Sequence, residues 1–258
     1  MVVLFATAAR AADFEGVLKS RVIEVAVPRL VVMLGRDATE PSKVFSVPIE
    51  RFVALSGPDS GVQVKDVEVK VRGSKLRVDT PAKDYYAIVD TDSASVSIVR
   101  PAEKRYLQLS KEDRRQMNAM REAKKEQGAQ ARKESTPPQI EVKALGKTQT
   151  INGMKATAYE VRTADGTSVG WIADGHKDVA RIYKIINSGD NPINMMPSTE
   201  GQASRALASK GLAIRIQTLD LDGYHVRELV SLEKKSFADD IFALPADFTK
   251  QKTPSSPD

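Results

Sequence analysis

Short runs of alternating apolar and polar residues follow one another along this chain, and turn residues rather than helical segments separate them. The segment TAYEVRTADGTSVGWIAD at 157–174 has two such runs on either side of Asp165-Gly166, a dipeptide typical of a tight hairpin turn. A second hairpin is predicted around Asp222-Gly223. Strands that succeed one another in hairpins pair antiparallel, so the sequence predicts an antiparallel sheet rather than strand–helix–strand units.

The remaining segments give a coarse secondary structure. Alternation predicts further strands at 14–25, 86–89, 95–99 and 104–109 and a hairpin at 64–79, with the runs 140–145 and 147–152 ahead of the Asp165-Gly166 hairpin. Helices are predicted at 46–58, at 110–134 with Ser110 and Asp113 as a capping box, and at 199–210 before Gly211. Residues 180–186 fit a strand or a short helix. We therefore expect an α+β fold, in which one curled antiparallel sheet of about ten or eleven strands forms a half-barrel and two or three helices cover its concave side.

The N-terminal segment suggests export. A short apolar run is followed by Ala9-Arg10-Ala11, a small–x–small pattern that predicts cleavage before Ala12 and makes residues 1–11 a signal-peptide remnant. The alternative is an ordinary N-terminal strand. With 258 residues, we expect one domain at 12–249 and a disordered tail at 250–258. No later run approaches the roughly 18 apolar residues of a membrane span, so we expect a periplasmic or secreted protein without a transmembrane segment.

Signatures of catalysis and metal binding are missing from the sequence. The chain has no cysteine, which excludes disulfides, thiolate metal sites and a lipid anchor on cysteine. Its two histidines, His176 and His225, do not have metal-ligand spacing. Asp90 and Asp92 flank a turn and are conceivable hydrolase carboxylates, but turn aspartates commonly make local hydrogen bonds. We expect neither an enzyme nor a cofactor.

The net charge of +5 is only weak evidence for an anionic partner. The basic stretch at 110–134 contains no aromatic residue and mixes both signs of charge, so nucleic-acid binding is not expected.

Seven segments, in order, resemble an uncharacterised family of exported bacterial proteins with the LolA/LolB-like lipoprotein-carrier fold. They are FEG at 14–16, VKVRGSKLRVD at 69–79, IVDTDSASVSIVRPAEKRYLQL at 88–109, TINGMKATAYEV at 150–161, GWIAD at 170–174, SKGLAIRI at 209–216 and FALPADF at 242–248. The resemblance implies a half-barrel with helices over its opening. Members of the wider fold bind acyl chains or lipoproteins in such a groove, whereas the family itself has no settled function.

This resemblance gives the candidate site. A two-residue turn at Asp165-Gly166 pairs Tyr159 with Ile172 and Val161 with Gly170 on one face, and it places Trp171 on the other. Either face would line an apolar groove, or both would pack as core. Methionine side chains repack around varied shapes, so four of them are expected in a movable cover: Met117, Met120, Met195 and Met196.

The expected function is a periplasmic, non-enzymatic protein that holds a lipid or lipoprotein acyl chain. Each buried methylene contributes about 0.8 kcal/mol, so apolar lining rather than net charge would set the affinity. The alternative is a structural or interaction module of a cell-envelope complex without a small ligand, with the charged segment at 110–134 as its docking surface.

Overall fold

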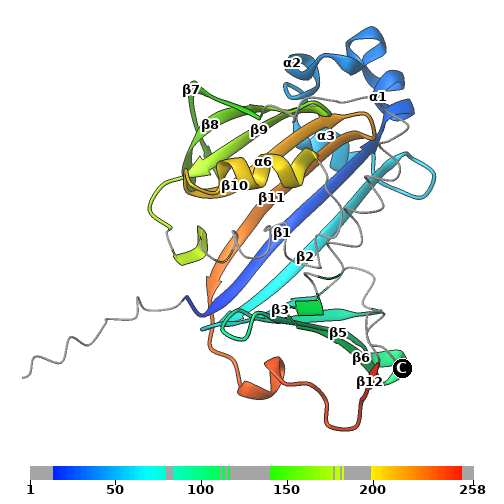
Figure 1. Ribbon diagram of the computed structural model, residues 1–258. Coiled ribbons are helices and arrows are strands. Elements are labelled where there is room, and N and C mark those ends of the chain that lie inside the picture. Colours follow the sequence, from blue (N-terminus) through cyan, green and yellow to red (C-terminus); the bar gives the residue numbers. More distant parts are fainter. Residues whose placement is uncertain are drawn as a thin grey trace, which may run out of the picture.

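One continuous sheet dominates the molecule (Figure 1). The computed structural model describes residues 14–79, 84–110, 112–113, 116, 140–176, 178–180, 182 and 199–251. The strands are β1 (Gly16–Ala26), β2 (Val62–Arg72), β3 (Lys75–Asp79), β4 (Tyr86–Asp90), β5 (Ser95–Arg100), β6 (Arg105–Leu109), β7 (Glu141–Ile151), β8 (Met154–Arg162), β9 (Gly166–Ala173), β10 (Leu212–Asp220), β11 (Gly223–Lys234) and β12 (Thr249–Gln251). Their order across the sheet is β12-β6-β5-β4-β3-β2-β1-β11-β10-β9-β8-β7.

The predicted antiparallel sheet is confirmed, and it is open, with β12 and β7 at its two edges. Among the described strands only β12 and β6 pair in parallel. The twelve strands exceed the ten or eleven expected, because β12 forms where the tail was predicted to begin. The central position of β1, between β2 and β11, joins the N-terminal and C-terminal halves of the chain.

The helices differ more from the prediction. They are α1 (Val27–Leu34), α2 (Pro41–Val44), α3 (Ile49–Ala54) and α6 (Thr199–Leu207), and 178–180 is also helical. The helix predicted at 46–58 shortens to α3, and α1, which was not predicted, follows β1 directly. Pro28 lies in the first turn of α1, where proline is tolerated because its missing N–H has no intrahelical partner.

Of the long helix predicted at 110–134, the structure describes the start. Ser110 and Asp113 form the predicted capping box: the Ser110 backbone N–H donates to Asp113 Oδ2 at 2.8 Å, and the Asp113 backbone N–H donates to Ser110 Oγ at 3.1 Å. Within the described ranges, every helix is too short or too polar to traverse a lipid bilayer.

The helices pack on both faces of the sheet, whereas the sequence predicted that they cover one. We call the face that carries Val161 and Ile216 the α6 face, because α6 packs against it. On the other face, Ile23 and Val25 of β1 pack against α1 and α3. Successive residues of a strand point to opposite faces, so the cross-strand register settles these positions.

The largest apolar cluster combines residues of β1–β5 with residues of β7–β11 and is filled by the protein's own side chains. Leu18, Val71 and Leu76 are almost fully buried in it, and Val179 and Ile182 from the segment after β9 pack into the same cluster. Close packing of this kind provides most of the stability of such a sheet.

Candidate functional site

The residues proposed from the sequence as an apolar wall share the α6 face, although their register differs from the predicted one. Tyr159 lies opposite Gly170 and Val161 lies opposite Ser168, two residues away from the predicted pairing. The cause is the position of the turn, which is centred on Ala164-Asp165 instead of Asp165-Gly166: the Thr163 N–H donates to the Gly166 carbonyl at 3.0 Å. A shift of two residues preserves the faces, so Tyr159, Val161 and Ile172 share one face and Trp171 is on the other.

Helix α6 covers this wall. Ala203 and Leu207 of α6 form a cluster with Val161, Ile172 and Ile216, and Tyr159 packs at its margin. The exposed fraction is 0% for Val161 and 2% for Ile172, so both are core residues in this structure rather than walls of an open groove. A ligand can therefore reach them only when α6 is displaced.

Polar contacts tie the N-terminal end of α6 to the sheet. Glu200 accepts a hydrogen bond from Arg227 Nε of β11, and Thr199 is hydrogen-bonded to the side chain of Asp220. His225 Nε2 is 3.4 Å from Asp220 Oδ1.

These contacts shift two pKa values. The hydrogen bond to Asp220 raises the pKa of His225 despite its burial. Burial raises the pKa of Asp220, but the hydrogen bonds from His225 and other neighbours outweigh burial and hold that pKa below its ordinary value.

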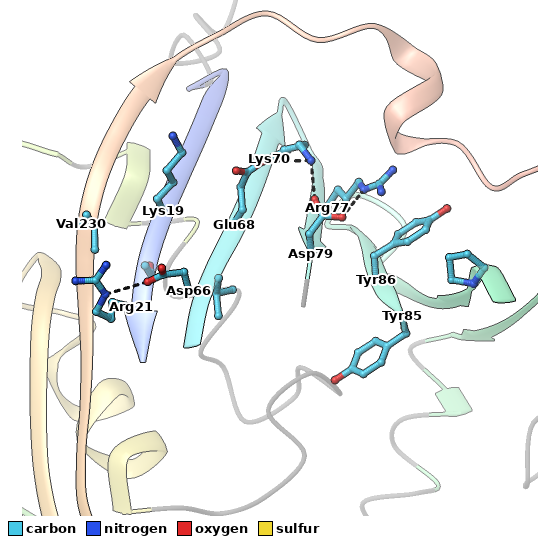
Figure 2. Close-up of a pocket in the computed structure, with 13 residues that line it drawn as sticks. Lys19, Arg21, Asp66, Glu68, Lys70, Arg77, Asp79, Tyr85, Tyr86 and Val230 are labelled. Carbon is cyan, nitrogen blue, oxygen red and sulfur yellow. Dashed lines mark hydrogen bonds and ion pairs between the residues drawn. The ribbon is translucent and has the colours of Figure 1, made fainter. Parts of the chain in front are cut away.

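A second candidate site lies on the opposite face of the sheet (Figure 2). It is a groove of about 880 Å³. Charged side chains from β1, β2 and β3 line it, together with two tyrosines: Lys19, Arg21, Asp66, Glu68, Lys70, Arg77, Asp79, Tyr85 and Tyr86. We call this set and the space above it the charged groove.

The charges in this groove are joined in ion pairs. Arg21 Nε is 3.0 Å from Asp66 Oδ1. Lys70 Nζ is 3.2 Å from Glu68 Oε1 and 2.6 Å from Asp79 Oδ2, and Arg77 Nε is 2.9 Å from Asp79 Oδ1. Burial raises the pKa of Asp79, but hydrogen bonds from Lys70 and Arg77 outweigh burial, so that its pKa is lowered overall.

One tyrosine of the charged groove stacks with this network. The Arg77 guanidinium carbon lies 3.8 Å from the centre of the Tyr86 ring, a cation–π contact.

Sequence reasoning missed the charged groove, although a signal was present. Charged residues alternate along β2 at 66, 68 and 70, and again along β3 at 77 and 79. A period of two predicts that they share one face of a sheet. The contribution of β1 to the same surface follows only from the pairing of β1 with β2.

The other predicted residues are dispersed. Trp171 lines a separate pocket of about 280 Å³ next to the segment between α2 and α3, and its buried indole Nε1 has no hydrogen-bond partner among the described residues. Asp90 Oδ1 accepts hydrogen bonds from the backbone N–H groups of Asp92 and Ser93, as is usual for a turn aspartate. Met117, Met120, Met195 and Met196 lie outside the described residues.

Across the described part of the chain, no group of three His, Asp or Glu side chains is close enough to hold a metal ion.

Comparison with solved structures gives low similarity. PNGF-II in a C2 crystal form has a TM-score of 0.39 and 10% identity over 93% of this chain, which spans 31% of the PNGF-II chain. A P21 form of PNGF-II gives a TM-score of 0.36 and 12% identity, with 88% of this chain and 29% of that chain covered. An uncharacterized conserved protein from Thermus thermophilus gives a TM-score of 0.42 and 7% identity, covering 92% of this chain and 90% of that one.

Comparison of sequences is more informative. No curated protein sequence matches the chain. The model of a family described as a domain of unknown function, DUF4412, matches residues 65–248. The match begins inside β2, so that β1 and α1–α3 precede it. The resemblance to an uncharacterised domain family is thereby confirmed, whereas the LolA/LolB-like fold stays a prediction. The chain belongs to the DUF4412 family.

Proposed function

We propose that this protein is a non-enzymatic binding protein of the bacterial cell envelope, periplasmic or secreted, which holds an acyl chain between α6 and the strands β8–β10. The observation that supports this most is the wall beneath α6. Val161, Ile172 and Ile216 form a continuous apolar surface, and a helix of only nine residues covers it.

The residues with which α6 covers the wall suit a movable cover. Its buried positions are mostly small, namely Thr199, Gly201, Ala203 and Ser204, and Leu207 is its one large buried side chain. Burial of one leucine contributes about 1.5–3 kcal/mol. A sixteen-carbon chain offers on the order of 12 kcal/mol of gross apolar burial, so a bound chain can replace the contacts that α6 gives up.

A direct test uses a fluorescent fatty acid as probe. We expect saturable binding of the probe, reversed by unlabelled palmitate. Native mass spectrometry of the same samples should show one fatty acid per chain. Absence of both probe binding and a bound mass would reject the proposal.

Variants at position 170 test the involvement of α6. A Cβ on Gly170 would collide with Leu207, so Gly170→Ala should loosen α6 and speed fatty-acid uptake. Gly57→Ala is the matched control, because no atom lies near a Cβ there. Equal uptake rates in the two variants would contradict a ligand site beneath α6.

One observation favours a second function, that of an interaction module without a small ligand. Helix α1 is apolar, yet Leu30 is its only fully buried residue. Val31 is 49% exposed, Val32 is 75% exposed and Leu221 is 88% exposed. The turn that carries Leu221 adjoins the start of α1, because Ala26 pairs with Gly223. Contiguous exposed apolar surface is typical of contact regions.

Polar substitution at this surface separates the two functions. The double variant Val32→Ser with Leu221→Ser should lose partners recovered from an envelope extract and keep binding of the fluorescent fatty acid unchanged. Partners retained in full by the double variant would reject α1 as their docking surface.

A further inference from the structure

We propose that the charged groove binds an uncharged saccharide chain. This inference concerns the face of the sheet opposite α6 and is independent of acyl-chain binding. It rests on the charge balance of the groove, on the hydrogen-bonding capacity of its floor and on the tyrosine at its wall.

Charge balance excludes strongly charged ligands. The groove is lined by four cations, Lys19, Arg21, Lys70 and Arg77, and by the three carboxylates of Asp66, Glu68 and Asp79. Lys19 Nζ is itself paired with Glu233 at 3.0 Å, which neutralises the remaining positive charge. A polyanion would approach three carboxylates and a polycation would approach four cations. Either ligand would have to disrupt existing ion pairs, so a neutral ligand fits best.

The floor offers donors and acceptors in alternation. Arg21 lies directly opposite Asp66 and Lys19 lies opposite Glu68 in the pairing of β1 with β2. Carboxylates only accept hydrogen bonds, and ammonium and guanidinium groups only donate them. A hydroxyl group can do both, so a chain of sugar hydroxyls can follow this alternation along its length.

A peptide fits this surface less well. Extended peptides usually bind along a sheet edge, where free backbone groups complete the ladder. The floor of the groove is the face of β1, β2 and β3, whose backbone groups pair within the sheet. Peptide N–H and C=O groups would therefore depend on side chains alone, and the unpaired ones would carry a desolvation cost.

Tyr85 completes the site. Its ring lies across the groove from Arg21 and Asp66 (Figure 2), and the residue is 39% exposed. The flat, apolar face of a tyrosine ring suits the C–H face of a pyranose. The volume of about 880 Å³ lies within the usual range of small-molecule sites.

The test is calorimetric titration with two neutral probes, cellohexaose and chitohexaose, at low and at high sodium chloride concentration. At least one should bind, with an affinity that hardly changes with salt, because no net charge is neutralised. A heparin-derived hexasaccharide and an octapeptide of alternating Lys and Glu are the comparison ligands. Failure of both neutral probes would overturn the proposal, and so would binding of a comparison ligand in their place.

Substitutions at Tyr85 make the test specific to the groove. An aromatic contact contributes about 0.5–1.5 kcal/mol, so Tyr85→Ala should weaken saccharide binding about two- to tenfold. Tyr85→Phe keeps the ring and should stay within about twofold. Tyr106→Ala, outside the groove lining, is the control, and unfolding curves confirm that each variant is folded. Equal affinities for Tyr85→Ala and Tyr106→Ala would overturn the assignment.

Acyl-chain binding beneath α6 and saccharide binding in the charged groove can be tested independently. Gly170→Ala should leave saccharide affinity unchanged, because residue 170 points to the α6 face. A loss of saccharide binding in Gly170→Ala would place the saccharide at the α6 face and overturn the groove as its site.

Discussion

Leu207 of α6 packs against Gly170 of β9 so closely that a Cβ on residue 170 would overlap its side chain. Gly170 is therefore the position at which β9 makes room for α6. The contact joins the only large buried side chain of α6 to the apolar wall of the sheet.

A double-mutant cycle should reveal this coupling. Gly170→Ala alone should lower the free energy of unfolding by about 1–3 kcal/mol through overpacking. Leu207→Ala alone should lower it by about 2–5 kcal/mol through the cavity it leaves. The double variant should lose less than the sum, because alanine at 207 relieves the clash. Urea unfolding measures all three, and strict additivity would contradict the contact.

The ion pair at the start of α6 should contribute more than a surface pair. Glu200 and Arg227 side chains are 18% and 24% exposed, so Glu200→Gln removes a partly buried charge partner and should cost about 1–3 kcal/mol. Glu103→Gln breaks the exposed pair with Arg100 and should cost less than about 1 kcal/mol. Similar losses in the two variants, measured by urea unfolding, would show that burial does not strengthen the Glu200 pair.

Stability should depend on pH through His225. Its pKa is raised above the ordinary value of 6.5, first by the hydrogen bond to Asp220 and further by the charges of Asp220, Glu200 and Glu24. The protonated imidazole therefore stabilises the fold at low pH, and this contribution is lost as pH rises through the raised pKa.

Thermal unfolding between about pH 5 and pH 8 checks this dependence. His225→Gln should flatten the profile in its upper part, whereas His176→Gln, outside this cluster, should leave it intact. An unchanged profile in His225→Gln would exclude His225 as its source.

A buried hydrogen bond on the face that packs against α1 and α3 should be costly to break on one side only. Gln217 Nε2 donates to Tyr224 Oη at 2.6 Å, and the two residues are 5% and 0% exposed. Tyr224→Phe should cost about 1–3 kcal/mol, because the Gln217 amide loses its partner. Adding Gln217→Leu should recover part of that loss in urea unfolding. A double variant less stable than Tyr224→Phe would contradict this account.

Several parts of the fold were predictable because their signals are local. Alternation located the hairpins at 64–79, 86–99 and 213–232, and Ser110 with Asp113 located a helix start. The region 26–60 was harder to predict. Its helices are short, and α1, α2 and α3 have no side-chain hydrogen bond at their N-caps, so the usual start signal is missing.

The candidate sites were likewise predictable from the sequence only in part. The shared face of Tyr159, Val161 and Ile172 followed from the side-chain period of two. The observed register differs by two residues, which leaves each side chain on the predicted face. Their burial under α6 did not follow, since residues 199–207 are distant in sequence from β8. The charged groove likewise needs β1 beside β2, which brings Arg21 opposite Asp66 and Lys19 opposite Glu68, 45 and 49 positions apart along the chain.

The sequence by itself determined which segments are strands and which of their residues share a face, because side-chain alternation is a property of neighbouring residues. Tertiary structure alone decided that β1 lies between β2 and β11, that α6 covers the apolar wall and that seven charges meet on the opposite face. Those outcomes depend on the free energy of long-range strand pairing and packing, which no local pattern of residues encodes.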